Sequence, residues 1–241
     1  MITKIELDKL VIKYETIDFI KDDPVQFPHL GKSKEEIELY GFIASLFAYG
    51  NRKIFIKKLD EIFSKSENDL VGFIKNGDFS CLKGIEYRFS KDCDIIPIFQ
   101  ILSKLYNESR GLEELFAYSS DNRLQAVVDY FYSQAPKMFT TGFYHMIPNP
   151  QNGGAMKRMN MFLRWMVRKG PVDLGVWSFI SPSELLIPLD VHVARVSREM
   201  GLLERKSNDF KAVLDLTNEL KKLCPEDPIK YDFAMFGFGV E

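Results

Sequence analysis

The chain has 241 residues, of which 46% are hydrophobic and 13% aromatic, so it can bury a substantial core. Its 32 lysine and arginine residues face 34 aspartate and glutamate residues, for a formal net charge of −2. This balance excludes a uniformly basic polyanion-binding protein and restricts any nucleic-acid surface to a local basic patch. The apolar content also excludes an intrinsically disordered chain.

The three cysteines lie far apart without a C-x-x-C pair (Cys81, Cys93, Cys224). This argues against a disulfide framework, a zinc ribbon and an iron-sulfur loop. The N-terminal sequence MITKIELDKLVIKYE is charged throughout, and no apolar run reaches the roughly 18 residues that span a bilayer. We therefore expect a cytoplasmic protein that is neither secreted nor inserted in a membrane.

Apolar residues recur mostly at helical spacing, and alternating runs between turn signals are hard to find. The sequence therefore predicts an all-α fold. Ser33 and Glu36 have the spacing of a capping box, and Ser66 or Asp69 caps a later helix that stops at Gly77. The predicted helices begin or lie near residues 33–50, 51–63, 66 or 69 to 74, 95–106, 121–131, 156–168, 191–200, 210–223 and 228 onward. Asp227 is expected to cap the last of these, with Pro228 at its first position.

The segment HMIPNPQNGGAMKR, residues 145–158, interrupts this helical pattern. It concentrates two prolines, two asparagines and two glycines, which favour turns and cannot continue a helix. We expect a hairpin or loop here, followed by a helix from Met156.

Asp190 stands at a predicted helix start. Pro188 disfavours helix at Ile187 and keeps it extended, and Gly201 ends the helix that follows Asp190. An aspartate at this position caps the helix, but position alone does not separate a capping role from a catalytic one.

The string IPLDVHVARV, residues 187–196, resembles a segment of the helix-hairpin-helix DNA glycosylases. In that superfamily a proline-preceded V-D-x-H-like motif places the active-site aspartate at a helix start; Leu189 stands where the motif has valine. The strings DPVQFPHL, FAYGN, KRMNMFLRWMVR and DPIKYDFAMFGFGVE resemble an uncharacterised bacterial family related to the archaeal 8-oxoguanine DNA glycosylases. The resemblance covers nearly the full chain.

This resemblance implies a two-lobed helix-hairpin-helix glycosylase-like fold with a cleft between the lobes. Residues 1–241 then form one glycosylase-like unit. One lobe is a helical bundle of residues 36–140, and the other combines residues 1–35 and 141–241 with the hairpin.

The resemblance also implies two catalytic residues. Asp190 corresponds to the carboxylate that favours positive charge at the deoxyribose C1′ as the damaged base departs. Lys157 follows Gly153 and Gly154 of the expected hairpin, where bifunctional members keep a Schiff-base lysine. It lies 33 residues before Asp190 (190 minus 157), a separation similar to that in the archaeal enzymes. The hairpin backbone is expected to hold a DNA phosphate.

Helix geometry predicts a basic face after the hairpin. Lys157, Arg164 and Arg168 fall within about 40° of one another at 100° per residue. A solvated helix face is the alternative interpretation of such a stripe. Beside the hairpin and the Asp190 motif, we expect Arg158, Arg164 and Arg168 to hold DNA phosphates.

Three further residues are candidate DNA contacts. His192, two residues after Asp190, could contact a phosphate, although a lone histidine near a helix start is more often a local hydrogen-bonding residue. The substrate base must leave the helical stack, and a wedge residue usually fills the gap that it leaves. Asn51 and Arg52, which follow the FAYG turn, are candidates for this wedge or for a contact with the DNA backbone.

The predicted function is base excision by a DNA glycosylase with abasic-site lyase activity, a hydrolase and lyase of DNA repair. Its partner is damaged double-stranded DNA, with an oxidised purine as the expected substrate. Two alternatives stay open: a catalytically silent helix-hairpin-helix module that binds nucleic acid, and a helical scaffold for protein partners in which Asp190 is purely structural. We expect no cofactor apart from a monovalent cation at the hairpin; His29 and His145 show no metal-ligand spacing.

Overall fold

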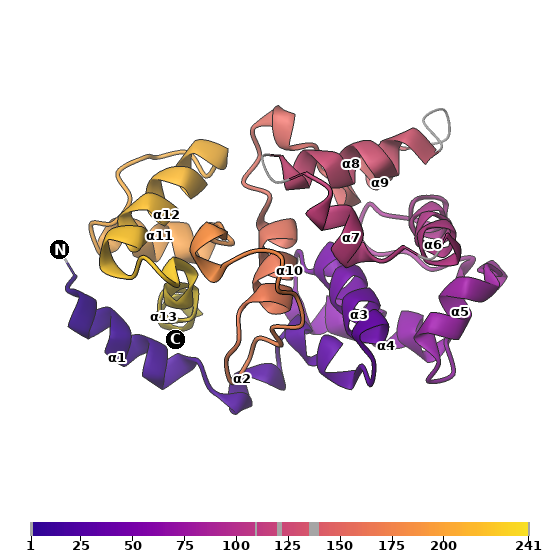
Figure 1. Cartoon of the computed structure of the whole chain (residues 1–241), viewed down its shortest axis with the longest axis horizontal. Coiled ribbons are helices and arrows are strands. Elements are labelled where there is room, and N and C mark those ends of the chain that lie inside the picture. Colours follow the sequence, from indigo (N-terminus) through magenta and orange to yellow (C-terminus); the bar gives the residue numbers. More distant parts are fainter. Residues whose placement is uncertain (1, 109, 120–121, 135–139, 241) are drawn as a thin grey trace. The chain divides into compact units, whose positions relative to one another are not determined.

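The computed structural model describes residues 2–108, 110–119, 122–134 and 140–240. These residues form helices and short 3₁₀ turns, and their only β-type pairings are isolated bridges (Figure 1). The predicted all-α class is therefore confirmed. Among the described helices, none combines the length and the apolar character needed to cross a bilayer.

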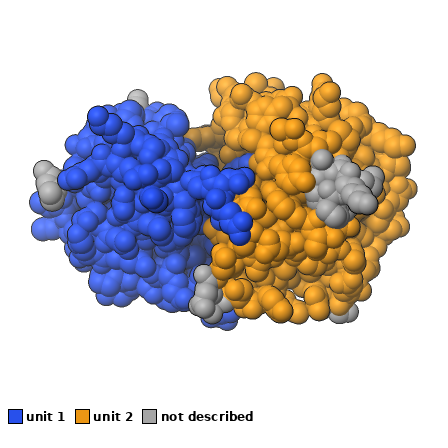
Figure 2. All heavy atoms as spheres, turned by 90° about the horizontal axis from the view of Figure 1, so that it is seen from above, with its two compact units in different colours: residues 1–21, 150–241 blue, residues 22–149 orange. Residues whose placement is uncertain are grey.

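Contacts divide the chain into two compact units (Figure 2). Unit 1 consists of Met1–Lys21 and Pro150–Glu241, and unit 2 is Asp22–Asn149. The predicted bundle of residues 36–140 falls within unit 2, which extends further at both ends. It includes α9 (Thr141–Met146) because this helix packs against α6 (Asp92–Asn107).

Unit 2 is built around α3 (Lys34–Phe47), whose residues are buried from Glu38 onward. The other helices of this unit are α4 (Arg52–Ser64), α5 (Leu70–Asn76), α7 (Leu112–Ala117) and α8 (Arg123–Gln134), with 3₁₀ turns η1 (Pro24–Gln26), η2 (Pro28–Leu30) and η3 (Ser80–Leu82). Helix α3 packs against α4, α5 and α7, and α6 packs against α5 and α8.

The helix ends of unit 2 follow the predicted signals. Ser33 Oγ accepts a hydrogen bond from Glu36 N at 3.2 Å, and Asp69 caps α5 through Gly72 N at 2.8 Å. Gly77 ends α5 with a φ of +77°. The Glu36 carboxylate accepts from the backbone N–H of Lys32 instead of completing the capping box.

Unit 1 contains a helix that the sequence analysis missed, α1 (Lys4–Tyr14). It begins with a capping box between Thr3 and Glu6, but only Leu7 and Val11 are buried, so its apolar pattern is weak. The remaining elements are α2 (Ile17–Ile20), η4 (Pro150–Asn152), α10 (Lys157–Val167), η5 (Pro182–Glu184), α11 (Val191–Glu199), α12 (Phe210–Leu223), η6 (Pro228–Lys230) and α13 (Tyr231–Val240). Both α1 and α11 pack against α13.

Candidate functional site

The extended segment before α11 places Asp190 at the helix N-cap, as predicted. The buried Ile187 N–H donates to Thr217 Oγ1 of α12 at 3.1 Å, which anchors this segment. Asp190 Oδ1 accepts from the backbone N–H groups of His192 and Val193, both at 2.9 Å. Oδ2 makes no hydrogen bond to any residue that the structure describes. One carboxylate oxygen of the half-buried Asp190 therefore caps the helix while the other is available.

The glycine loop before α10 presents open backbone. Gly153 has a φ of +75°, and a Cβ atom added at Gly153 or Gly154 would meet nothing within 4 Å. The loop is fixed to the start of α12, because Phe210 N donates to Gly153 O at 2.8 Å. Met156, the N-cap of α10, has a φ of +52° and makes no side-chain capping bond. The helix therefore starts with its positive dipole end beside exposed glycine backbone.

Lys157 is the first residue of α10 and is half-buried. Within the described parts of the chain, its Nζ forms no hydrogen bond or ion pair. Lys157 differs in this respect from Arg164 of the same helix and from Arg168 at its C-cap, which both form buried ion pairs.

Lys157 and Asp190 both act on a third charged group, Asp232 in α13. Burial raises the pKa of Asp232 to about 6. The positive charges of Arg164 and Lys157 lower this pKa, whereas the negative charge of Asp190 raises it. Residues at the starts of α10 and α11 therefore both influence the pKa of one buried carboxyl group in α13.

The sequence analysis did not single out Asp232. Its side chain is only 8% exposed and is hydrogen-bonded to Arg164. Its Oδ1 is buried and has no hydrogen-bond partner among the described residues. An acid inside the apolar run YDFAMFGF was the available signal, since a helix that is apolar on nearly all sides is usually buried.

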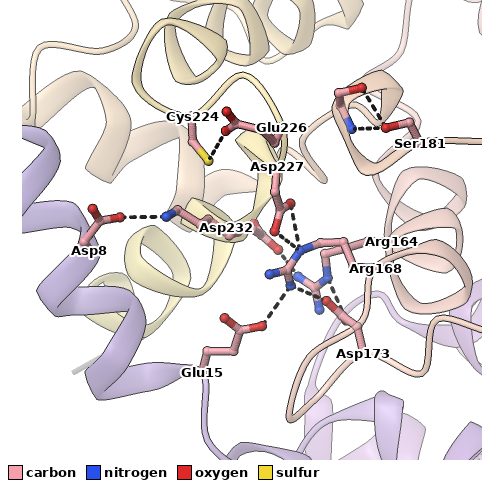
Figure 3. A network of polar contacts seen from close by, with 12 residues as sticks. Asp8, Glu15, Arg164, Arg168, Asp173, Ser181, Cys224, Glu226, Asp227 and Asp232 are labelled. Atoms are coloured by element: carbon pink, nitrogen blue, oxygen red, sulfur yellow. Dashed lines mark hydrogen bonds and ion pairs between the residues drawn. The ribbon is translucent and has the colours of Figure 1, made fainter.

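Arg164 and Arg168 lie at the centre of a buried ion-pair network (Figure 3). Arg164 bonds to Asp173 at 3.2 Å and to Asp232. Arg168 bonds to three carboxylates, those of Asp173 at 2.5 Å, Glu15 at 2.9 Å and Asp227 at 2.9 Å. Each arginine also lies over the ring of Phe233, Arg164 at 4.3 Å from its centroid.

The prediction that Arg164 and Arg168 form a DNA-facing basic surface is therefore wrong. Each arginine is 4% exposed, and its guanidinium donors are used by the carboxylates around it. The helix places these arginines on one face with Lys157, as expected, but acids from distant parts of the chain cover that face. Only Lys157, at the end of the stripe, lacks an ion pair among the described side chains.

The other predicted contacts of unit 1 are accessible. Arg158 is half-buried beside Lys157. His192 is also half-buried, with its ring 6.2 Å from that of Phe236. Its backbone N–H donates to Asp190, and the role of its ring stays a prediction.

Asn51 and Arg52 belong to unit 2. Asn51 is exposed, and its Oδ1 caps α4 by accepting from Ile54 N at 3.3 Å. Arg52 donates from Nη1 to the backbone oxygen of Asp22 at 3.4 Å. Asn51 therefore has a structural role, and contact with DNA stays a prediction for both residues.

The described residues include no group of three or more His, Cys, Asp or Glu side chains that could hold a metal ion. The loop carbonyls of Pro150 and Gly153 already accept backbone N–H groups, at 2.9 and 2.8 Å. These two carbonyls are therefore already used within the protein, and a monovalent cation at the loop stays a prediction.

Comparison with known proteins gives a family but no activity. A family model described as "Protein of unknown function (DUF2400)" matches residues 23–241. No curated protein and no solved structure matches the chain. Because the family model spans most of the sequence, the protein belongs to the DUF2400 family.

Proposed function

We propose that this protein is a base-excision DNA glycosylase with abasic-site lyase activity on damaged double-stranded DNA, with oxidised purines as substrates. In this proposal its two units are the lobes of a helix-hairpin-helix glycosylase-like fold. One observation carries the proposal. Lys157, which has no ion pair among the described residues, and Asp190, whose carboxylate has one oxygen outside the capping bonds, lie at the starts of two helices of the same unit, and both influence the pKa of buried Asp232.

In the proposed reaction Lys157 is the nucleophile. The neutral amine forms a bond to C1′ while the glycosidic bond breaks, and the electron pair leaves with the base, which takes up a proton. After the nitrogen loses a proton, the C1′–O4′ bond breaks, O4′ takes up a proton, and a protonated imine joins Lys157 to C1′. Loss of a C2′ proton then forms a C2′–C3′ double bond and expels the 3′ phosphate. The absence of an ion pair at Lys157 Nζ among the described residues supports this role.

Asp190 stabilises the positive charge that develops at C1′ as the base leaves. Its capping bonds fix the carboxylate, since two backbone N–H groups hold Oδ1 at 2.9 Å. A carboxylate held in this way needs no reorganisation when the charge appears. Capping and catalysis are therefore compatible in this residue.

The start of α10 supplies the phosphate contact in this proposal. Exposed backbone at Gly153 and Gly154 and the uncapped helix start favour an anion. Arg158 and His192 are the side chains of unit 1 that could add to it, and Asn51 and Arg52 could contact the DNA backbone from unit 2. Arg164 and Arg168 have no part in DNA binding, because their charges are already neutralised inside the unit.

The test is trapping of the imine. The protein is incubated with a duplex that contains an abasic site or 8-oxoguanine, borohydride is added, and covalent adducts are separated on a denaturing gel. We expect an adduct with the wild type and none with Lys157→Ala. Lys169→Ala is the matched control, because Lys169 is an exposed lysine near the end of the same helix.

Asp190→Asn separates catalysis from capping. An asparagine side chain also caps a helix, so folding should be retained while the rate falls about a hundred-fold or more with the loss of charge. Absence of any adduct with folded wild-type protein would contradict the lyase. DNA binding that survives Lys157→Ala and Asp190→Asn, with no turnover by the wild type, would identify a nucleic-acid-binding module instead.

A further inference from the structure

A tight turn in unit 2 presents an aromatic ring to solvent. Tyr87 N donates to Ser90 O at 2.8 Å, and Ser90 N donates to Tyr87 O at 3.0 Å, so Arg88 and Phe89 form the tip of a two-residue turn. Phe89 is 50% exposed, although large apolar side chains usually lie in the core of this protein. This Arg88–Phe89 tip lies outside every element used in the proposed reaction.

The tip is supported by the FAYGN segment. Tyr49 Oη lies 3.2 Å from Tyr87 O, to which it donates, and 3.1 Å from Ser90 Oγ; Tyr87 Oη in turn donates to Tyr49 O. Gly50 has a φ of +79°, and a Cβ atom there would lie 2.7 Å from Tyr87 Oη and 2.5 Å from Arg88 Nη1. The positive φ favours glycine at this position, and a Cβ atom would also displace the Arg88 guanidinium or the Tyr87 hydroxyl.

The Phe89 ring itself is held on two sides. It stacks against Tyr49, with centroids 5.5 Å apart and an interplanar angle of 23°, and meets His145 edge to face at 4.2 Å. An exposed ring that is held in this way loses little conformational freedom when a ligand packs against it.

Arg88 is held in an unfavourable backbone conformation. Its φ of +57° is a region that residues other than glycine rarely adopt. Two-residue hairpin turns call for a positive φ, which glycine or asparagine usually supplies, and strained positions of this kind cluster at functional sites. Here the strain accompanies an exposed arginine directly before the exposed ring.

The tip and its support are positively charged. Residues 51–53 and 86–92 carry four cations and two acids: Arg52, Lys53, Arg88 and Lys91 against Glu86 and Asp92. The Asp92 carboxylate already accepts from the N–H groups of Gly84 and Cys93. In a chain whose net charge is −2, this segment is locally basic and carries an aromatic ring at its tip.

We propose that the Arg88–Phe89 tip is a DNA contact of unit 2, in which Phe89 packs against an unstacked base and Arg88 pairs with an adjacent phosphate. Aromatic rings bind unstacked bases with little sequence preference, and arginine forms charge-assisted bonds to phosphate. The inference rests on the proposed function because it takes DNA as the ligand. It adds a contact that neither Asn51 nor Arg52 supplies.

Phe89→Ala tests the stacking. Affinity is measured for a duplex with one abasic site opposite 2-aminopurine and for the fully paired duplex. We expect Phe89→Ala to lower affinity for the abasic duplex about five- to 150-fold and to reduce the change in 2-aminopurine fluorescence. The paired duplex should be affected much less. Phe89→Trp should bind as the wild type does, and Tyr118→Ala, which removes an aromatic side chain that is 87% exposed elsewhere in unit 2, is the control.

Arg88→Gly tests the phosphate contact in a variant that should fold at least as well as the wild type. Glycine relieves the strain at positive φ, so we expect a higher midpoint of thermal unfolding together with weaker DNA binding. The slope of log affinity against log salt concentration should decrease by about 1.

The two proposals fail in different ways. If borohydride traps the wild type on DNA and Phe89→Ala binds DNA as tightly as the wild type, the tip contact is overturned while the proposed lyase activity is supported. DNA binding that depends on Phe89 without trapping would support the tip and contradict the lyase. An equal loss on both duplexes, or no DNA binding by the wild type, would overturn the tip contact.

Discussion

Replacement of Arg168 by methionine distinguishes a buried arginine from a DNA-facing one. Arg168→Met keeps most of the side-chain volume but leaves Asp173, Glu15 and Asp227 without this partner. The side chains of these acids are 0%, 10% and 28% exposed, and Asp173 retains Arg164. Removal of one partner from a buried ion pair costs about 3–5 kcal/mol. Because Asp227 can regain water and Asp173 keeps one arginine, we expect about 3 kcal/mol.

The assay is thermal or urea unfolding, with Lys169→Met as the control. Lys169 is the next residue and is exposed, so its replacement should change stability by less than about 0.5 kcal/mol. For a chain of this size, a loss of about 3 kcal/mol lowers the midpoint by roughly 6–12 °C. An unchanged midpoint for Arg168→Met, combined with weaker DNA binding and a smaller salt slope, would refute the buried network and restore the phosphate-contact interpretation.

Two further predictions follow from buried polar groups. Burial raises the pKa of Asp232 to about 6 from 3.8, so the folded state keeps a proton that the unfolded chain has lost, and stability falls as the pH rises from about 4 to about 6. The difference in free energy of unfolding between wild type and Asp232→Asn should therefore decrease across this range by at most about 3 kcal/mol; a flat difference in urea titrations would contradict the buried acid. Thr217→Val removes the acceptor of the buried Ile187 N–H and should cost about 1–3 kcal/mol in unfolding experiments, whereas Thr217→Ser should keep most of that stability. Equal stabilities of the two Thr217 variants would show that the bond contributes little.

Local signals predicted the helices well where a cap and an apolar stripe coincide. Gly77 gave the end of α5, Asp69 is the one of its two predicted caps that the structure shows, and Asp190 gave the start of α11. Helix α1 was missed because it buries only Leu7 and Val11 and so shows little periodicity. Asp227 was predicted to cap the last helix, but it makes no capping bond and pairs with Arg168 instead.

The candidate site was predictable only in part. Asp190 was found because the proline before it and the helix after it are local features. The arginines of α10 were misassigned because a helical projection shows which residues share a face but not what covers that face. The partners of Arg168, Glu15 and Asp227, lie 153 and 59 residues away in the chain. Asp232 was not singled out for the same reason, since the residues whose charges affect its pKa, among them Lys157 and Asp190, belong to other helices.

Mass spectrometry of the trapped adduct tests the central claim most directly. Wild-type protein is reduced with borohydride on a duplex that contains an abasic site and is then digested, and the peptide that carries the deoxyribose remnant is sequenced. The proposed function predicts one modified lysine, Lys157 at the start of α10. Modification of Lys169 or of scattered surface lysines, or no modified peptide from folded protein, would contradict it.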